Sequence, residues 1–186
     1  MKVTRKDFST EAGALVPASP KAPAQGRKLA LPAWTSMFIC IGLPLFLGTA
    51  IEFITGSASV ELLARIKLPP LSPPEMAIKA AWLGLYILTG AASYLVLKSG
   101  CAPVRRRRAL IAYGVQLAVG AAWAPVFFLA ESFGIAVGIS LLFMAAIAVT
   151  MDFFTRCSAV AGKLLIPCLL WSSFLSYFTI GAALLN

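Results

Sequence analysis

Hydrophobic residues are gathered into five long segments of this sequence, and polar residues lie mainly between them. Each segment has close to the roughly 20 residues that a helix needs to cross about 30 Å of hydrocarbon. Lipid cannot satisfy the backbone hydrogen-bonding groups of an open strand, so helices must span the membrane. The pattern predicts an all-α integral membrane protein, a five-transmembrane-helix bundle, with spans at 34–55, 76–97, 109–129, 133–154 and 163–185.

Residues 1–33 differ from the five segments in composition. They mix Pro, Ala, Ser and charged residues without a sustained period. Such a segment cannot bury enough apolar surface to fold, and we expect a disordered, basic N-terminal tail. The predicted organisation is therefore a tail at 1–33 and a membrane domain at 34–186.

Prolines lie both between the spans and within them. Pro44, Pro125 and Pro167 interrupt three spans, where they predict kinks or frayed ends rather than breaks. Between the first two spans, the run Leu68-Pro69-Pro70-Leu71-Ser72-Pro73-Pro74 cannot be helical. It predicts a stiff, proline-rich loop at the membrane surface.

The overall composition supports membrane insertion. The chain is 60% hydrophobic and 12% charged, whereas soluble domains carry about 25% charged residues. A chain this apolar cannot cover its own surface with polar groups. Part of that surface must therefore face lipid, in a bacterial or an organelle membrane.

The net charge of +9 comes from residues placed to one side of the predicted spans. The tail, the second connection and the fourth connection hold 13 basic residues, and the opposite side holds 3. The positive-inside rule then predicts that the N-terminus is cytoplasmic. Arg105 to Arg108 fit a topology determinant that touches anionic lipid headgroups, with docking of a partner protein as the alternative. No basic face for nucleic acid is expected.

Residues suited to catalysis or metal binding are few. Glu52, Glu131 and Asp152 lie near predicted helix ends, where their side chains can reach the membrane interface. The absence of His removes the commonest metal ligand. No nucleophile–base pair or carboxylate dyad is evident, so we expect neither an enzyme nor a required cofactor. The four cysteines show no metal-type spacing, and they indicate no disulfide framework: Cys40, Cys101, Cys157 and Cys168.

Five short motifs follow one another along the spans. After the proline-rich loop, Trp82 and Tyr86 are four residues apart, on one face of the second helix. Tyr113-Gly114-Val115-Gln116-Leu117 and Trp123-Ala124-Pro125-Val126-Phe127-Phe128 follow in the third span. A last motif runs from Ala161 to Trp171. Over about 34–186 this arrangement resembles the TspO/MBR family, the tryptophan-rich sensory proteins of bacteria and the translocator proteins of mitochondria.

The resemblance implies a five-helix bundle, often dimeric, whose pocket is closed by the proline-rich loop. Family members bind porphyrins and haem-related tetrapyrroles, sterols and synthetic apolar ligands, and some promote porphyrin breakdown. The pocket residues that the resemblance implies are Trp82, Tyr86, Gln116, Trp123, Trp171, Phe174 and Leu175, with lid prolines Pro69, Pro73 and Pro74. The implied partners are membrane lipid, an apolar small molecule, and a second copy or the other subunits of a membrane complex.

Several positions depart from the family pattern. Gly120, Cys168 and Thr179 stand where the family has polar or aromatic side chains, and each lost polar contact is worth about 1 kcal/mol. The tryptophans could also be interface anchors, as Trp34 is expected to be, and Gln116 could form an interhelical hydrogen bond. Two functions remain: a binding or transport-like protein, and a diverged accessory subunit or scaffold.

Overall fold

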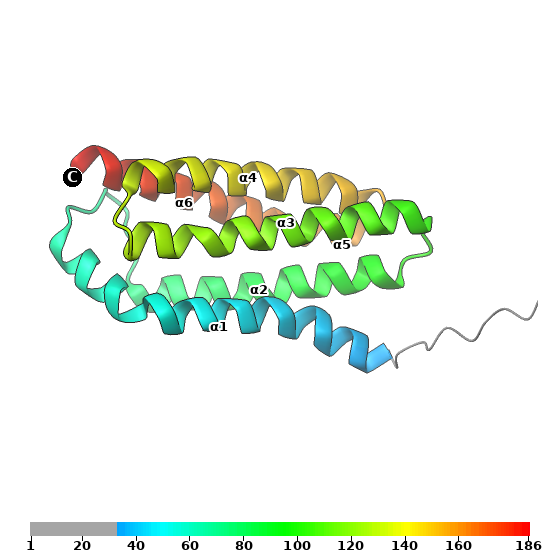
Figure 1. Ribbon diagram of the computed structural model, residues 1–186. Helices are drawn as coiled ribbons and strands as arrows, with labels where there is room; N and C mark the ends of the chain where they lie inside the picture. Colours follow the sequence, from blue (N-terminus) through cyan, green and yellow to red (C-terminus); the bar gives the residue numbers. More distant parts are fainter. Residues whose placement is uncertain (1–32) are drawn as a thin grey trace, which may run out of the picture. The chain divides into compact units, whose positions relative to one another are not determined.

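The computed structural model describes residues 33–186, and residues 1–32 of the predicted tail lie outside them (Figure 1). The described chain is helical, without a strand, and it carries six helices. The helices are α1 (Ala33–Arg65), α2 (Glu75–Lys98), α3 (Pro103–Phe128), α4 (Phe133–Thr155), α5 (Ala159–Lys163) and α6 (Ile166–Leu185). Short connections and antiparallel neighbours give an up-and-down bundle, in which α3 packs on α4, α4 on α6, and α1 on both α2 and α3.

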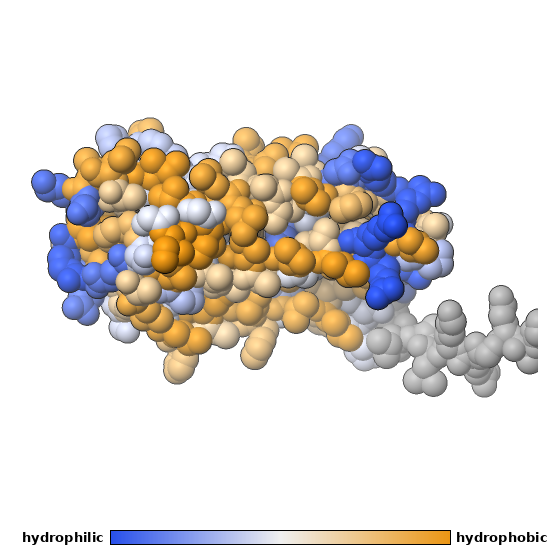
Figure 2. All heavy atoms as spheres, turned by 45° about the horizontal axis from the view of Figure 1, so that its top comes forward, coloured by the Kyte–Doolittle hydropathy of each residue, from blue (hydrophilic) through white to orange (hydrophobic). Residues whose placement is uncertain are grey.

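The five predicted spans are confirmed. Helices α1 to α4, and α5 with α6 as one unit, are long and apolar enough to cross a membrane. Large apolar side chains face outward along the helices; Phe53 on α1, for example, is 91% exposed. In Figure 2 hydrophobic residues cover the flank of the bundle and hydrophilic ones gather at its two ends. The chain is a multi-pass integral membrane protein.

Helix α1 ends ten residues later than the sequence predicted. Hydropathy falls at Gly56 and Ser57, but nothing from there to Arg65 breaks a helix, and the first proline of the loop is Pro69. The extension is anchored in the core by Leu62, which is 1% exposed. Glu52 therefore lies well inside α1, and the prediction that it sits near a helix end was wrong.

Two prolines lie in the first turn of a helix, and two others lie inside helices that remain continuous. Pro103 occupies the first turn of α3, where its missing N–H is not needed, so the helix begins before the arginine run. Pro167 likewise lies in the first turn of α6, after a short break that separates it from α5. Pro44 and Pro125 lie within continuous α1 and α3, in agreement with the prediction that they do not break the spans.

A disulfide joins Cys101, between α2 and α3, to Cys157, between α4 and α5. The Cα atoms are 5.2 Å apart, within the normal range for a disulfide. The spacing of the cysteines predicted no disulfide framework, and that prediction was wrong. The two residues are 56 positions apart, and only the antiparallel return of α3 and α4 brings them together. Cys40 and Cys168 are buried free thiols, as expected.

The bundle has two distinct ends. We call the end that carries the 66–74 and 129–132 connections and Asn186 the loop end. The other, which carries the 99–102 and 156–158 connections, is the basic end. Asp152 is near that end, paired with Arg156 through a 2.9 Å contact on the exposed surface.

Candidate functional site

The main cavity lies in the half of the bundle toward the loop end and measures about 300 Å³. It is bordered by α1, α2, α3 and α6, and its wall is mainly apolar and aromatic. Six of the seven predicted pocket residues border it: Trp82, Tyr86, Trp123, Trp171, Phe174 and Leu175. Gln116, the seventh, borders a smaller chamber beside it.

Trp82 is the centre of the aromatic wall. Its ring stacks on Tyr86 with centroids 5.7 Å apart, because the two residues are one helical turn apart on α2. It also meets Trp171 edge-on at 6.2 Å and lies against Phe143 at 6.4 Å. Phe174 continues the wall from Trp171 at 5.4 Å. Aromatic pairs at these separations attract one another beyond simple burial, so they hold the wall in place.

Two glycines that no sequence argument singled out as site residues make room for these rings. The ring of Tyr86 lies so close to Gly48 of α1 that a Cβ there would overlap it. At Gly120 of α3, an added Cβ would lie 2.7 Å from Cε2 of Phe143. Gly120 had been noted only as the loss of a polar side chain. In the structure its missing side chain lets Phe143 approach the wall.

The tryptophans of the site differ in what their indole N–H groups contact. Trp123 Nε1 donates to Thr179 Oγ1 at 3.1 Å in the core, and the Thr179 hydroxyl donates in turn to the Leu175 carbonyl. Thr179 had been noted as a departure from the family pattern, yet it is the partner of a buried indole. By contrast, Trp171 Nε1 is buried without a hydrogen-bond partner among residues 33–186.

Gln116 is buried in the chamber beside the cavity. It is 2% exposed, and its Oε1 has no hydrogen-bond partner among the described residues. One turn earlier on α3, the buried Tyr113 hydroxyl also has no hydrogen-bond partner among the described residues. Tyr113 borders none of the cavities described. An interhelical hydrogen bond had been the alternative role for Gln116; its carbonyl oxygen makes none here.

An ion pair joins α1 and α2 at the edge of the main cavity. Lys79 Nζ lies 3.1 Å from Glu52 Oε1, and each side chain is about half exposed. Both residues border the cavity. The sequence placed Glu52 near a predicted helix end and did not indicate that it pairs with Lys79. No signal in the sequence fixes the register between α1 and α2 that brings them together.

The proline-rich loop is fastened to α6. Pro69 is buried against Gly181, and the Tyr177 hydroxyl donates to the Pro70 carbonyl at 2.7 Å. The Asn186 side chain accepts from the Lys67 amide at 2.9 Å and donates to the Lys67 carbonyl at 3.0 Å. The three lid prolines, Pro69, Pro73 and Pro74, do not border the main cavity. Closure of the pocket by this loop stays a prediction.

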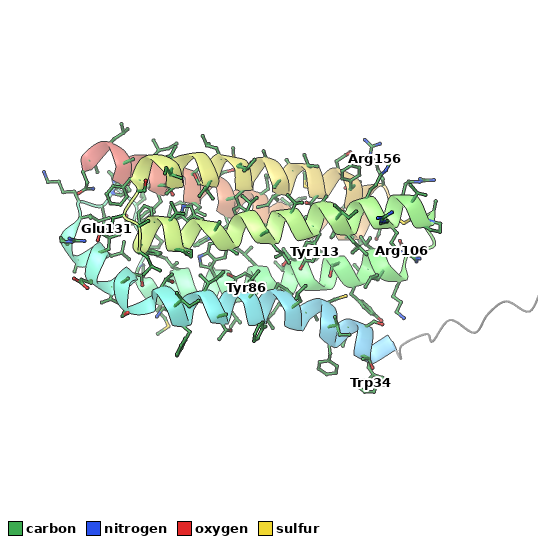
Figure 3. The ribbon with its side chains drawn as sticks, in the orientation of Figure 1. Trp34, Tyr86, Arg106, Tyr113, Glu131 and Arg156 are labelled. Carbon is green, nitrogen blue, oxygen red and sulfur yellow. A yellow bond between two sulfur atoms is a disulfide. The ribbon has the colours of Figure 1, made fainter. Side chains whose placement is uncertain are left out.

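Residues outside the cavity have simpler surroundings. Trp34 is 64% exposed and projects from the start of α1, away from the bundle (Figure 3), which suits an interface anchor. Figure 3 also places Tyr86 between α1 and α2, and Arg106 at the basic end. Glu131, in the third connection, pairs with Arg65 at the loop end. Three of the acids discussed are thus paired with basic residues near the ends of the bundle or the cavity edge.

The arrangement suits a membrane-embedded binding site. Ligand cavities in proteins are mostly apolar and carry a few placed polar groups, and this one follows that design. Among the described residues, no three His, Cys, Asp or Glu side chains are grouped as they would be around a metal ion. The polar groups that border the two cavities include the ion pair at the edge, the hydroxyl groups of Thr49, Thr55, Ser59 and Tyr86, and the inner groups of Gln116 and Trp171.

Comparison with known proteins identifies relatives over most of the chain. The profile of the TspO/MBR family matches residues 40–185. The tryptophan-rich protein TspO of Chlorobaculum tepidum is 29% identical over 151 residues, which is 81% of this chain and 96% of that protein. Translocator protein 2 of Canis lupus familiaris is 36% identical over 107 residues, 56% of this chain and 62% of that protein. Human translocator protein is 36% identical over 112 residues, 60% of this chain and 66% of that protein.

Proposed function

Because the chain belongs to the TspO/MBR family, we propose that it binds a flat, largely apolar ligand of the tetrapyrrole or sterol kind in the main cavity. The observation that supports this proposal is the cavity of about 300 Å³ with the rings of Trp82, Trp123 and Trp171 in its wall. That volume is at the lower end of the range for small-molecule sites. An apolar guest would gain about 25 cal/mol for each Å² of surface removed from water.

The proposed function is binding without covalent chemistry. The cavity wall offers rings, aliphatic side chains, the hydroxyl groups of Thr49, Thr55 and Ser59, and one ion pair. None of the hydrogen bonds described pairs one of these hydroxyl groups with a basic side chain that could activate it as a nucleophile. Its position in the membrane-spanning part lets an apolar molecule reach it from the lipid. Transfer of the ligand between lipid and protein is the transport-like role that this geometry supports.

Titration with protoporphyrin IX tests the proposal. Purified full-length protein in nanodiscs is titrated while tryptophan emission is followed, with protein-free nanodiscs as the blank. We expect saturable quenching in the micromolar range. Trp82→Ala and Trp171→Ala should weaken the affinity at least tenfold, since each removes a ring that borders the cavity. Trp34→Ala, which removes an exposed ring outside the cavity, is the matched control and should leave the affinity unchanged.

The scaffold alternative gives a different result. If the protein is an accessory subunit with a vestigial cavity, quenching will not saturate, and mild solubilisation will recover a stoichiometric complex with other membrane proteins. That pair of outcomes would overturn the binding proposal.

A further inference from the structure

A small inner chamber adjoins the main cavity deep in the bundle. Its volume is about 40 Å³, and it shares Trp82, Tyr86 and Trp171 with the main cavity. Gln116 and Thr89 also border it. A single water needs about 10–15 Å³ of such space, so the chamber holds a few waters or one small chemical group. The chamber is too small for the main apolar part of a ligand, but it is large enough for one terminal polar group.

Two of the residues that border this chamber, Gln116 and Trp171, each carry a buried polar atom. The Gln116 carbonyl oxygen is an acceptor and the Trp171 indole N–H is a donor, and neither has a partner among residues 33–186. The Thr89 hydroxyl, on another residue that borders the chamber, donates to the Leu85 carbonyl at 2.9 Å. Buried polar groups in proteins almost always have partners, and lipid offers none. A ligand group that satisfies both atoms must therefore carry a hydrogen-bond donor for Gln116 Oε1 and an acceptor for the Trp171 N–H.

The chamber also limits the charge of that guest. Among the described residues, those bordering it are uncharged; the nearest ion pair described, Glu52 with Lys79, borders only the main cavity. Moving a carboxylate into such surroundings without a counter-charge is strongly unfavourable. A neutral hydroxyl or carboxamide, in contrast, carries one donor and at least one acceptor.

We propose that the inner chamber is a subsite for the neutral polar end of the ligand. Its ligand would have an apolar body in the main cavity and a hydroxyl or carboxamide end that donates to Gln116 Oε1 and accepts from Trp171 Nε1. A ligand whose buried end is a carboxylate is rejected. This inference rests on the proposed binding function and adds to it the chemical class of the group at the inner end.

A matched series of pyrenes tests the subsite. Pyrene, 1-pyrenemethanol and 1-pyrenecarboxylate share one flat apolar body and differ only at the end group. Binding to full-length protein in nanodiscs is followed by direct excitation of pyrene, and each affinity is corrected for partition into protein-free nanodiscs. We expect the alcohol to bind about tenfold more tightly than pyrene, because it gains hydrogen bonds that the hydrocarbon cannot make. The carboxylate should bind more weakly than pyrene.

The readout is the ratio of the alcohol affinity to the pyrene affinity. A variant that merely loses folded protein binds less of both ligands, so this ratio does not change. In Gln116→Leu and in Trp171→Phe the ratio should fall toward one, while pyrene itself still binds. Thr150→Val and Trp34→Phe are the controls, because they alter a buried hydroxyl and an indole away from both cavities. Both should keep the tenfold ratio.

Two results would overturn the subsite while leaving the binding function intact: a ratio that is unchanged in both chamber variants, or a carboxylate that binds as tightly as the alcohol. If none of the three pyrenes and no porphyrin saturates the wild-type protein, the proposed function itself fails, and the subsite fails with it. The two failures are thus distinguished by whether pyrene binds.

Discussion

The two ends of the bundle are fastened by different kinds of contact. At the loop end, separate weak contacts connect the elements: Arg65 with Glu131, Tyr177 with the loop, and Asn186 with Lys67. At the basic end, one covalent bond between Cys101 and Cys157 joins two connections. The main cavity lies toward the weakly fastened end. When the disulfide is formed, the basic end is held by a covalent bond, whereas the loop end is held by non-covalent contacts.

The largest expected effect concerns the side of the membrane that the basic end faces. Its charges predict a cytoplasmic location, where thiols are kept reduced, whereas disulfides persist in oxidising compartments. We expect the orientation to follow the charges and the pair to be reduced in growing cells. In intact cells, Cys101 and Cys157 should then react with a membrane-permeant maleimide and not with an impermeant one. The test protein is Cys40→Ala/Cys168→Ala, which leaves only these two cysteines.

The opposite pattern would contradict this orientation. If the pair reacts only after a reductant is added outside, and then with the impermeant reagent, the basic end faces an oxidising compartment.

Removal of the disulfide tests how firmly the basic end is fixed. The bond closes a loop between residues 56 positions apart, and the chain-entropy treatment gives an upper value of about 4 kcal/mol for such a loop. We expect Cys101→Ser/Cys157→Ser to lower the midpoint of thermal unfolding of the oxidised protein in detergent by several degrees. Dithiothreitol should lower the wild-type midpoint equally and leave the variant unchanged. A reductant effect of the same size on the variant would show that the bond is not its cause.

A buried hydrogen bond tests the core of the loop half. Thr179→Val removes the acceptor of the Trp123 indole and leaves that N–H buried without a partner, at a cost of about 1–3 kcal/mol. Thr150→Val is the control, since the Thr150 hydroxyl donates only to the Ala146 carbonyl of its own helix. We expect the Thr179 variant to unfold at the lower temperature in detergent. Equal midpoints would mean that the Trp123 bond contributes nothing to stability.

The loop contacts are expected to act locally. Asn186→Ala removes the acceptor of the Lys67 amide and the donor to its carbonyl, and Tyr177→Phe removes the bond to Pro70. Each hydrogen bond contributes about 1 kcal/mol, so hydrogen exchange at Lys67 should be roughly fivefold faster in Asn186→Ala. Exchange in α4 should not change. Unchanged exchange at Lys67 would show that Asn186 does not hold the loop.

The smallest effect is expected for the surface ion pair. Arg65 and Glu131 are 58% and 47% exposed, and exposed pairs are worth about 0.2–1 kcal/mol. A double-mutant cycle with Arg65→Gln and Glu131→Gln should give a coupling in that range, and it should shrink in 0.5 M salt because screening weakens exposed pairs. A coupling above 2 kcal/mol would move this contact into the same class as the buried bonds.

The sequence predicted the five spans because hydropathy and helix length are properties of each segment alone. It placed the end of α1 at residue 55 because hydropathy falls there, whereas the helix continues to Arg65, where core packing of Leu62 supports it. Tyr86 and Trp171 were found from the family pattern. The clearance at Gly48, the pairing of Glu52 with Lys79 and the disulfide depend on how separate helices are aligned, and a single sequence does not carry that alignment.

The bond between Cys101 and Cys157 also determines how the chain behaves when it is cut. It encloses α3 and α4 in one covalent ring. A protease that cuts the 129–132 connection opens the ring without releasing a fragment, so the protein keeps its mass on a non-reducing gel. The 66–74 loop lies outside the ring, and a cut there frees α1 from every covalent link to the other helices. Limited proteolysis would thus separate the protein into α1, held by non-covalent contacts alone, and a remainder of α2 to α6 that stays linked even after a second cut between α3 and α4.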